Sequence, residues 1–96
     1  MSVEVRQAEE GSKGAFTAWE GDRRAGVMTY SRGNPAFVIV DHTEALAGFE
    51  GRGIGKLLVA SAVEWARQNG QKIMPLCPYT RAVFERTPDY ADVWFK

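Results

Sequence analysis

Three alternating glycines, Gly51, Gly53 and Gly55, stand at the start of a stretch with helical periodicity. The unpaired amides at a helix start carry the positive end of its dipole, and glycine lets an anion approach them without a Cβ in the way. The segment could therefore hold a phosphate group. A tight turn from strand to helix, with no ligand, is the alternative interpretation.

Two common phosphate-binding patterns do not fit this segment. A Walker A loop needs a glycine five residues before its Gly-Lys pair and Ser or Thr after it, but Glu50 and Leu57 stand there. The dinucleotide pattern Gly-x-Gly-x-x-Gly fails as well, because its third glycine would fall on Lys56 or Leu58. The sequence therefore predicts neither a P-loop NTPase nor a Rossmann enzyme.

Three titratable side chains stand near the ends of predicted strands, namely His42, Glu44 and Cys77. The pKa of an unperturbed histidine is close to neutrality, so His42 could act as a general base. Glu44 lies on the same side if the strand continues, where it could act directly or through water. The alternatives are a strand-end hydrogen bond for His42, a solvated carboxylate for Glu44, and a small core residue at Cys77.

The elements that carry these residues follow from hydrophobic periodicity. Alternating or β-branched segments predict strands at residues 3–8, 14–20, 24–31 and 36–41. The run at 36–40 is apolar without alternation, which is typical of a central strand covered on both faces. Gly21-Asp22 suits the hairpin turn between the second and third strands.

From Ile54 onward the apolar residues recur at helical spacing, until Asn69-Gly70 ends the pattern. Residues 72–76 then form a strand parallel to the apolar one, since a crossover helix normally joins parallel strands. A short helix is predicted at 80–87, and the tail at 90–95 is either a strand or irregular aromatic cover.

The composition describes one globular domain over residues 1–96, because 96 residues are too few for two cores. Twelve basic residues balance twelve acidic ones, so we expect neither nucleic acid nor an anionic membrane as a partner. One cysteine and an N-terminus without leader features indicate a cytoplasmic protein. We expect no metal site, and an exposed edge strand would allow a monomer or a weak homodimer.

Gly53-Ile54-Gly55 resembles the Gln/Arg-x-x-Gly-x-Gly/Ala motif of the GNAT superfamily of acetyl-CoA-dependent N-acetyltransferases, with Glu50 at the first position in place of Gln or Arg. The resemblance spans residues 23–88 and rests also on Asp41-His42-Thr43-Glu44, Pro75-Leu76-Cys77-Pro78-Tyr79 and Pro88-Asp89-Tyr90-Ala91-Asp92. Together these segments are similar to a compact GNAT-like subfamily. The resemblance implies an α+β fold: a mixed, mostly antiparallel twisted sheet, a strand–helix–strand core that binds acyl-CoA, and a short second helix.

The resemblance also implies where the coenzyme and the reacting groups lie. The implied coenzyme-binding residues are Thr43, Glu44, Ala45, Glu50, Gly51, Arg52, Gly53, Ile54, Gly55, Lys56, Pro78, Tyr79 and Arg81. Amides around Thr43–Ala45 would hold the oxyanion, and Cys77 would lie near the acetyl group as acyl acceptor or as the acid that reprotonates CoA. The general-acid tyrosine of many members falls on Phe84, which has no proton to donate. Arg81 and Arg86 could approach the 3′-phosphate, since an arginine fork matches phosphate oxygens.

These observations predict an enzyme that transfers an acetyl group from acetyl-CoA to an amine, either a protein lysine or a small molecule. A lysine-like amine is neutral only about once in 2,500 molecules at pH 7, so the reaction needs a base. His42, Glu44 and Cys77 are the catalytic candidates. The alternatives are a non-catalytic or weakly catalytic acyl-CoA-binding module, and a small interaction domain whose glycines are structural.

Overall fold

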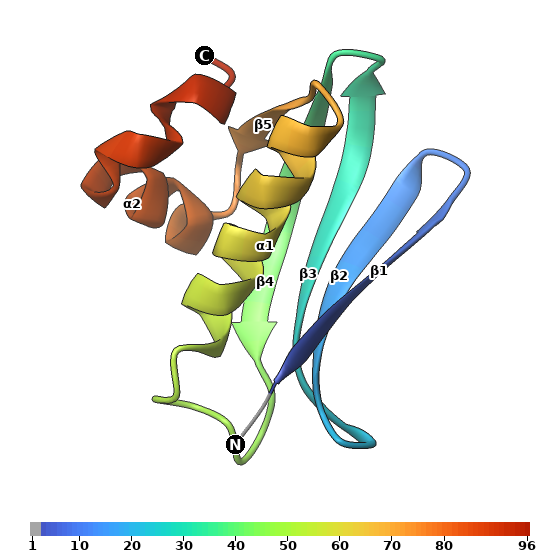
Figure 1. Cartoon of the computed structure of the whole chain (residues 1–96), viewed down its shortest axis with the longest axis vertical. Helices are drawn as coiled ribbons and strands as arrows, with labels where there is room; N and C mark the ends of the chain where they lie inside the picture. The colour runs from blue at the N-terminus through green and yellow to red at the C-terminus, as the bar shows by residue number, and fades with distance from the viewer. Residues whose placement is uncertain (1–2) are drawn as a thin grey trace.

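In a computed structural model, residues 3–96 fold into a five-stranded sheet with helices packed against one face (Figure 1). The strands lie across the sheet in the order in which they occur in the chain. The elements are β1 (Glu4–Glu10), β2 (Lys13–Glu20), β3 (Arg23–Asn34), β4 (Phe37–Ala45), α1 (Ile54–Gln68), β5 (Lys72–Pro75), α2 (Pro78–Arg86) and the 3-10 helix η1 (Pro88–Val93).

Strands β1 to β4 form an antiparallel meander, and β5 adds a parallel neighbour to β4. The β2–β3 turn contains Gly21 with a φ of 62°, a left-handed conformation that glycine adopts without strain. The crossover through α1 places Val38 beside Ile73 and Val40 beside Pro75. The predicted hairpin and the predicted strand–helix–strand core are thereby confirmed.

Helix α1 covers one face of the sheet and packs across β2 to β5. Beneath it lie Met28 and Val40, and Leu58 of α1 has no exposed surface. The expectation that residues 36–40 are covered on both faces was wrong. Ile39 faces the open side of the sheet and is only half-buried. Its neighbour Phe37 is apolar because it stacks on Phe95, with ring centroids 4.0 Å apart.

Several element boundaries differ from the predicted ones. Strand β4 continues through the polar residues 41–44 to Ala45, because residues 42–45 pair with β3. Helix α2 begins at Pro78 instead of residue 80, since proline is well suited to the first helical position, where its missing N–H costs no hydrogen bond. The tail forms η1 and then a single parallel bridge between Trp94 and Ile73. Neither interpretation of the tail included the 3-10 helix that residues 88–93 form.

Strand β4 contains a β-bulge at Asp41. Tyr30 pairs with Val40 and Thr29 pairs with His42, so Asp41 is an extra residue between two registered pairs. The Thr29 hydroxyl donates to Asp41 Oδ1 at 2.6 Å, which fixes Asp41 on the open face beside it. The bulge thus brings Asp41 and His42 to the same face, although they are consecutive in sequence.

Candidate functional site

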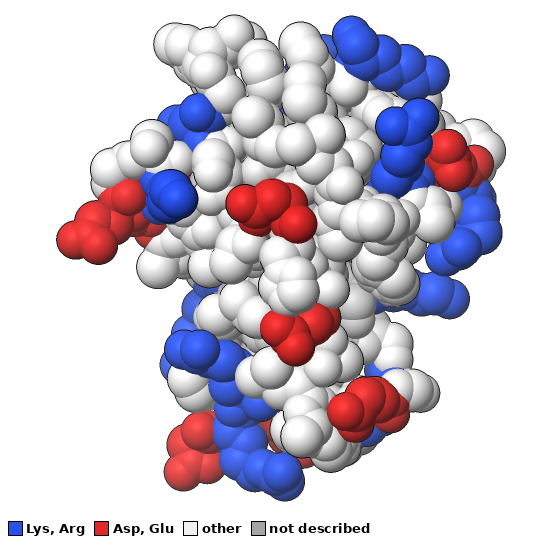
Figure 2. Space-filling model, turned by 180° about the vertical axis from the view of Figure 1, so that it is seen from behind, with Lys and Arg blue, Asp and Glu red and all other residues white. Residues whose placement is uncertain are grey.

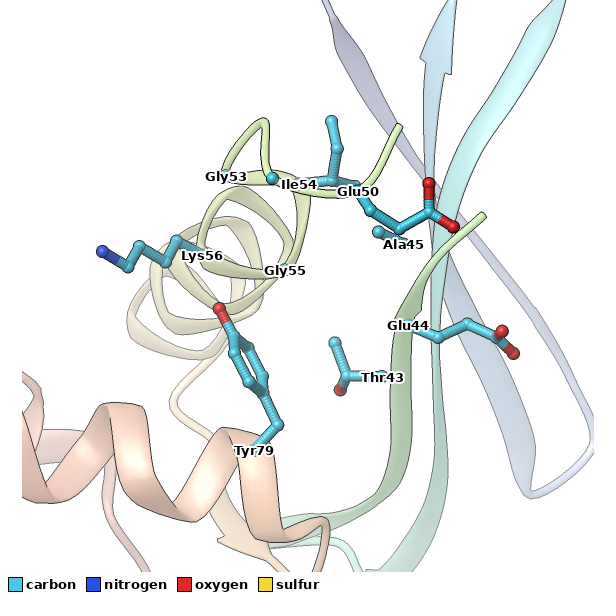
Figure 3. A pocket seen from close by; sticks show the side chains of 10 residues that line it. Thr43, Glu44, Ala45, Glu50, Gly53, Ile54, Gly55, Lys56 and Tyr79 are labelled. Atoms are coloured by element: carbon cyan, nitrogen blue, oxygen red, sulfur yellow. The ribbon is translucent and has the colours of Figure 1, made fainter. Parts of the chain in front are cut away.

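The two parallel strands separate at the point where β5 ends. The amides of Leu76 and Cys77 both donate to the Val40 carbonyl, at 3.0 Å each, and the chain then turns into α2. Beyond Val40, β4 has β3 on one side and no strand on the other. A gap opens there between the last residues of β4 and the first turns of α1 and α2 (Figure 3).

This gap forms a hollow of about 400 Å³. Its lining residues are Thr43, Glu44, Ala45, Glu50, Gly51, Gly53, Ile54, Gly55, Lys56 and Tyr79. All ten belong to the set that the sequence analysis assigned to a coenzyme. Figure 3 shows Thr43 and Tyr79 directed into the hollow, while the carboxylate of Glu44 points away from it, to the other side of β4.

The glycine turn presents unpaired amides to the hollow. The first helical hydrogen bond of α1 runs from the Leu57 amide to the Gly53 carbonyl, at 3.0 Å. The N–H groups of residues 54–56 therefore have no acceptor within the helix. Among residues 3–96, no side chain caps this terminus, and its first turn holds no acidic residue. The arrangement leaves an electropositive helix end that can accept an anion.

The three glycines have different local roles. Gly51 and Gly53 take φ angles of 78° and 76°, which a residue with a Cβ adopts only with strain, and the space where a Cβ would stand is empty at both. Gly55 has an ordinary helical conformation, but a Cβ there would lie 2.8 Å from the ring of Tyr79. Gly55 therefore lets α2 approach α1 closely, and the first two glycines shape the turn.

The charged residues of the turn are only partly directed at the hollow. Arg52 does not line it. The Arg52 guanidinium donates to Glu20 Oε2 at 2.8 Å and lies over the Phe49 ring, 5.0 Å from the centroid. The carboxylate of Glu50 accepts a hydrogen bond from the Gly48 amide at 3.0 Å. Lys56 is the basic residue among those that line the hollow.

His42 and Glu44 lie on the same side of β4, as their spacing predicted, and this side is the open face of the sheet. His42 Nε2 is 2.8 Å from Glu44 Oε1, and both side chains are about half exposed. The hydrogen bond to Glu44 raises the pKa of His42, and the charges of Cys77 and Asp41 raise it further. Seen from behind (Figure 2), acidic side chains stand within a largely uncharged surface, with Lys and Arg toward its margins.

Cys77 occupies the N-cap position of α2 and is 5% exposed. Burial raises the pKa of its thiol, but hydrogen-bond donors at the start of α2 outweigh burial and lower the pKa overall. These donors are the amides of Tyr79 and Thr80 and the hydroxyls of Thr80 and Thr43. The sequence analysis did not single out Thr80. The sequence could have indicated Thr80 because it stands three residues after Cys77, the N-cap residue of a helix that begins with Pro78.

Three other predicted positions lie outside the hollow or have another role. Arg81 pairs with Glu85 at 3.4 Å and lines a different hollow, near the C-terminus, so the structure does not bring it to the glycine turn. Pro78 does not line the hollow either and serves as the first residue of α2. Phe84 is buried against Tyr90 and Trp94.

Tyr79 is the titratable residue of α2 that lines the hollow. Partial burial raises the pKa of its hydroxyl, and the positive charge of Arg86 partly offsets this effect. Arg86, one of two arginines considered for a phosphate, is therefore within electrostatic range of a residue that lines the hollow.

The fold agrees with comparisons to known proteins. A family model described as GCN5-related N-acetyl-transferase matches residues 15–93. The chain belongs to this family. The GNAT resemblance of the glycine turn and of the flanking segments is thereby confirmed. Among proteins with curated descriptions, none matches the chain.

Solved structures of GNAT proteins share the fold. A GCN5-like protein of Staphylococcus aureus superposes with a TM-score of 0.72 and 27% identity, over 96% of this chain and 87% of that one. A Bacillus subtilis acetyltransferase in complex with CoA gives a TM-score of 0.70 and 19% identity, over 88% and 74%. An aminoglycoside acetyltransferase from a soil metagenome gives 0.63 and 14%, over 80% and 57%. The last two likenesses show the fold alone.

Two features are absent from residues 3–96. No helix in this range is long and apolar enough to cross a membrane. No three His, Cys, Asp or Glu side chains come together there as a metal site would require.

Proposed function

We propose that this GNAT protein transfers the acetyl group of acetyl-CoA to a primary amine. The observation that carries the proposal is the hollow between β4 and the start of α1, onto which unpaired amides of α1 open. Family membership supports acetyl transfer in general, and the B. subtilis acetyltransferase with the same fold was solved with CoA bound.

The diphosphate of the coenzyme would lie against the first turn of α1. The amides of residues 54–56 would donate to its oxygens, and the ammonium group of Lys56 would add a positive charge. Glu50 would not oppose this, because its carboxylate is turned to the Gly48 amide. Arg86, near Tyr79, is our candidate for the 3′-phosphate, in preference to Arg81.

The acetyl end would reach the point where β4 and β5 separate. Successive amides along β4 point alternately to β3 and to its unpaired edge, so those of Thr43 and Ala45, which face this edge, could stabilise the oxyanion of a tetrahedral intermediate. The acceptor amine would approach from the open face, where His42 stands. Neutral His42 would take the proton of the attacking amine, and Glu44 would stabilise the resulting imidazolium through the 2.8 Å hydrogen bond.

Cys77 would act as acyl acceptor in this scheme. Its sulfur forms a bond to the acetyl carbon, the bond from that carbon to the CoA sulfur breaks, and CoA leaves as a thiolate that takes a proton from protonated His42. The amine then attacks acetyl-Cys77, His42 accepts the amine proton, and Cys77 leaves as a thiolate. Direct transfer to the amine, with Cys77 protonating CoA, is the competing route.

Thiol release from acetyl-CoA across a panel of primary amines tests the proposal. We expect CoA formation that depends on an amine, and a Cys77→Ala variant at least tenfold slower with its CoA affinity little changed. Mass spectrometry of the protein after acetyl-CoA without amine distinguishes the two routes, because only the covalent route leaves an acetyl group on Cys77. No release with any amine, despite CoA binding, would contradict the proposed activity.

A non-catalytic acyl-CoA-binding module is the second candidate function. Phe84 falls at the position where many GNAT enzymes have a tyrosine that acts as general acid. It is buried, and its side chain has no proton to donate. Coenzyme binding with no amine-dependent thiol release is the result that would favour this function over the enzyme.

A further inference from the structure

The open face of the sheet carries short side chains near its centre. On β2 and β3 the residues that alternate with the buried ones there are partly exposed, namely Ala15, Thr17, Val27 and Thr29. Within residues 3–96 the helices lie on the opposite side of the sheet (Figure 1). Seen from the open side, the surface is largely uncharged, with acidic side chains within it (Figure 2). A second sheet could therefore pack on this face at the usual separation of about 10 Å.

The register of the sheet sets four residues of this face in one row. Arg6 on β1 pairs with Thr17 on β2, which pairs with Val27 on β3. Val27 in turn pairs with Glu44 on β4. Arg6 and Thr17 share one face, because the Arg6 guanidinium lies over the ring of Trp19, whose Nε1 donates to the Thr17 hydroxyl. The row therefore begins with a basic side chain, ends with an acidic one and has two short side chains between them.

A row of this kind is complementary to itself. When a second copy is turned by 180° about an axis that runs along the strands between β2 and β3, β1 of each copy lies over β4 of the other. Arg6 of each copy then faces Glu44 of the other, and Thr17 faces Val27. Both charged side chains are accessible for such a contact, with 53% of the Arg6 side chain and 49% of the Glu44 side chain exposed.

The neighbouring row fits the same rotation by shape. It consists of Ala8, Ala15, Thr29 and His42, which are paired in this order across β1 to β4. The rotation places Ala8 of one copy opposite His42 of the other, so that the smallest side chains of the row meet its largest. Ala15 would face Thr29, and two short side chains again meet at the centre of the contact.

Other ways of pairing two copies bring like charges together. A rotation axis across the strands would lay β4 over β4, with Asp41 and Glu44 of both copies in one region. Antiparallel pairing of two β1 edges would bring Glu4 of one copy toward Glu9 and Glu10 of the other. The charges of the chain therefore favour the face over the edge, and an axis along the strands over one across them.

The area of the face suits a weak dimer. Four strands about 4.8 Å apart, each about seven residues long at about 3.4 Å per residue, cover roughly 450 Å². Two copies would bury about twice this flat area, close to the lower limit of about 1,000 Å² for a specific interface. The third row, which ends in Glu10 and Ile39, adds no ion pair. We therefore expect association only at high protein concentration.

We propose that two copies of this chain associate through the open faces of their sheets, as a weak and reversible dimer with two Arg6–Glu44 ion pairs. This inference does not rest on acetyl transfer. The hollow at the start of α1 lies on the other side of the sheet and would stay open in the dimer. His42 and Glu44 would be covered, so in the proposed reaction only the monomer would admit the amine.

Sedimentation equilibrium of the full chain over a range of concentrations measures the dissociation constant of the dimer. We expect a monomer–dimer equilibrium that salt weakens, because partly exposed ion pairs are screened. Arg6→Glu and Glu44→Arg should each raise the dissociation constant about tenfold, since each creates two contacts between like charges. The double variant, Arg6→Glu with Glu44→Arg, exchanges the charges in both contacts and should restore association close to that of the wild type.

A matched control separates this contact from a general effect of charge. Arg81→Glu changes the net charge by the same amount but lies on α2, away from the open face, and should leave the dissociation constant unchanged. Thermal unfolding establishes that each variant is folded. A chain that stays monomeric at millimolar concentration, or single variants that associate like the wild type, would overturn the inference. Dimer formation without amine acetylation would contradict only the proposed function.

Discussion

At the scale of single residues, the proposed reaction makes opposite demands on two groups of the site. His42 must be neutral to accept a proton, while its partner Glu44 favours the charged form. Cys77 must lose its proton in a buried position, against the effect of burial itself. The structure meets the first need by leaving the His42 pair half exposed, and the second by placing hydrogen-bond donors around the sulfur.

Replacement of Glu44 by Gln tests the electrostatic relation at His42. The pKa of His42 is raised in the folded protein chiefly by Glu44, so the variant should titrate at lower pH than the wild type. In the proposed reaction neutral His42 accepts the proton of the amine, so the acidic limb of the kcat/KM profile for the amine should move to lower pH as well. The imidazole NMR signals of this single histidine report the pKa directly. An unchanged midpoint would show that Glu44 does not control His42.

Not every site residue was recognisable from the sequence. Two of the residues that line the hollow, Gly53 and Tyr79, belong to segments that resemble the GNAT family. Lys56, which also lines it, directly follows one of these segments. Thr80 belonged to no recognisable motif, because a threonine in the first turn of a helix can be identified only once the start of the helix is known. Arg81 was assigned to the coenzyme, but its side chain leaves α2 toward Glu85. Side-chain direction on a short helix depends on a boundary that differed by two residues from the predicted one.

At the scale of elements, the turn before α1 is fixed from both ends. Phe49 is 2% exposed and is held between the guanidinium groups of Arg23 and Arg52, each 5.0 Å from its ring. Arg52 in turn pairs with Glu20 at the end of β2. The β2–β3 hairpin therefore supports the turn that presents its amides to the hollow.

A Phe49→Ala variant should weaken the whole turn. Removal of a buried phenylalanine costs about 3 to 5 kcal/mol in typical cores, and here it also removes the platform under two arginines. We expect a lower midpoint of unfolding in urea and weaker CoA binding by calorimetry. Glu20→Gln removes only a partly exposed ion pair and should cost less than about 1 kcal/mol. Equal stability of the two variants would contradict the anchoring role of Phe49.

Two glycines offer a matched comparison at the ends of α1. Gly53 before the helix and Gly70 after it have φ angles of 76° and 64°, with open space around both. Alanine at either position should cost about 1 kcal/mol of stability through backbone strain. Only Gly53→Ala should also weaken CoA binding, because only Gly53 lies at the hollow. Equal CoA affinity of both variants would remove the turn from the coenzyme site.

The elements themselves were predictable where periodicity was strong. Ile54, Leu58 and Ala62 recur at helical spacing, and they are buried in α1. The apolar run at 36–40 marked a strand, but its polar continuation to Ala45 depends on pairing with β3, which no local pattern shows. The bulge at Asp41 also depends on the pairing of β4 with β3. The separation of β4 from β5 follows from where α2 begins, and its consequence, the hollow, was therefore not visible in the sequence.

At the scale of the whole molecule, one face of the sheet is covered by helices and the other is open (Figure 1). The hollow with the helix amides lies on the covered side of β4, and the His42–Glu44 pair lies on the open side. Strands β4 and β5 separate beside Cys77, which is buried and does not itself line the hollow. In the proposed reaction the coenzyme and the amine would approach this point from the two sides of the sheet.

Coenzyme binding should stabilise the molecule as a whole. A ligand that binds only the folded state at 100 times its Kd adds about 2.7 kcal/mol to the free energy of unfolding. We therefore expect the unfolding temperature to rise with CoA concentration. Adenosine at the same concentrations, which lacks the diphosphate, should raise it much less. Equal effects of the two would indicate that the phosphate groups make no specific contact.

The central claim is that amides at the start of α1 bind the coenzyme diphosphate. Titration of ¹⁵N-labelled protein with CoA, followed by amide NMR shifts, tests it most directly. The account predicts saturable shifts at Gly53, Gly55 and Lys56 that exceed those at the opposite end of α1, such as Gly70. No shifts at these amides at millimolar CoA, or shifts confined to other parts of the chain, would contradict it.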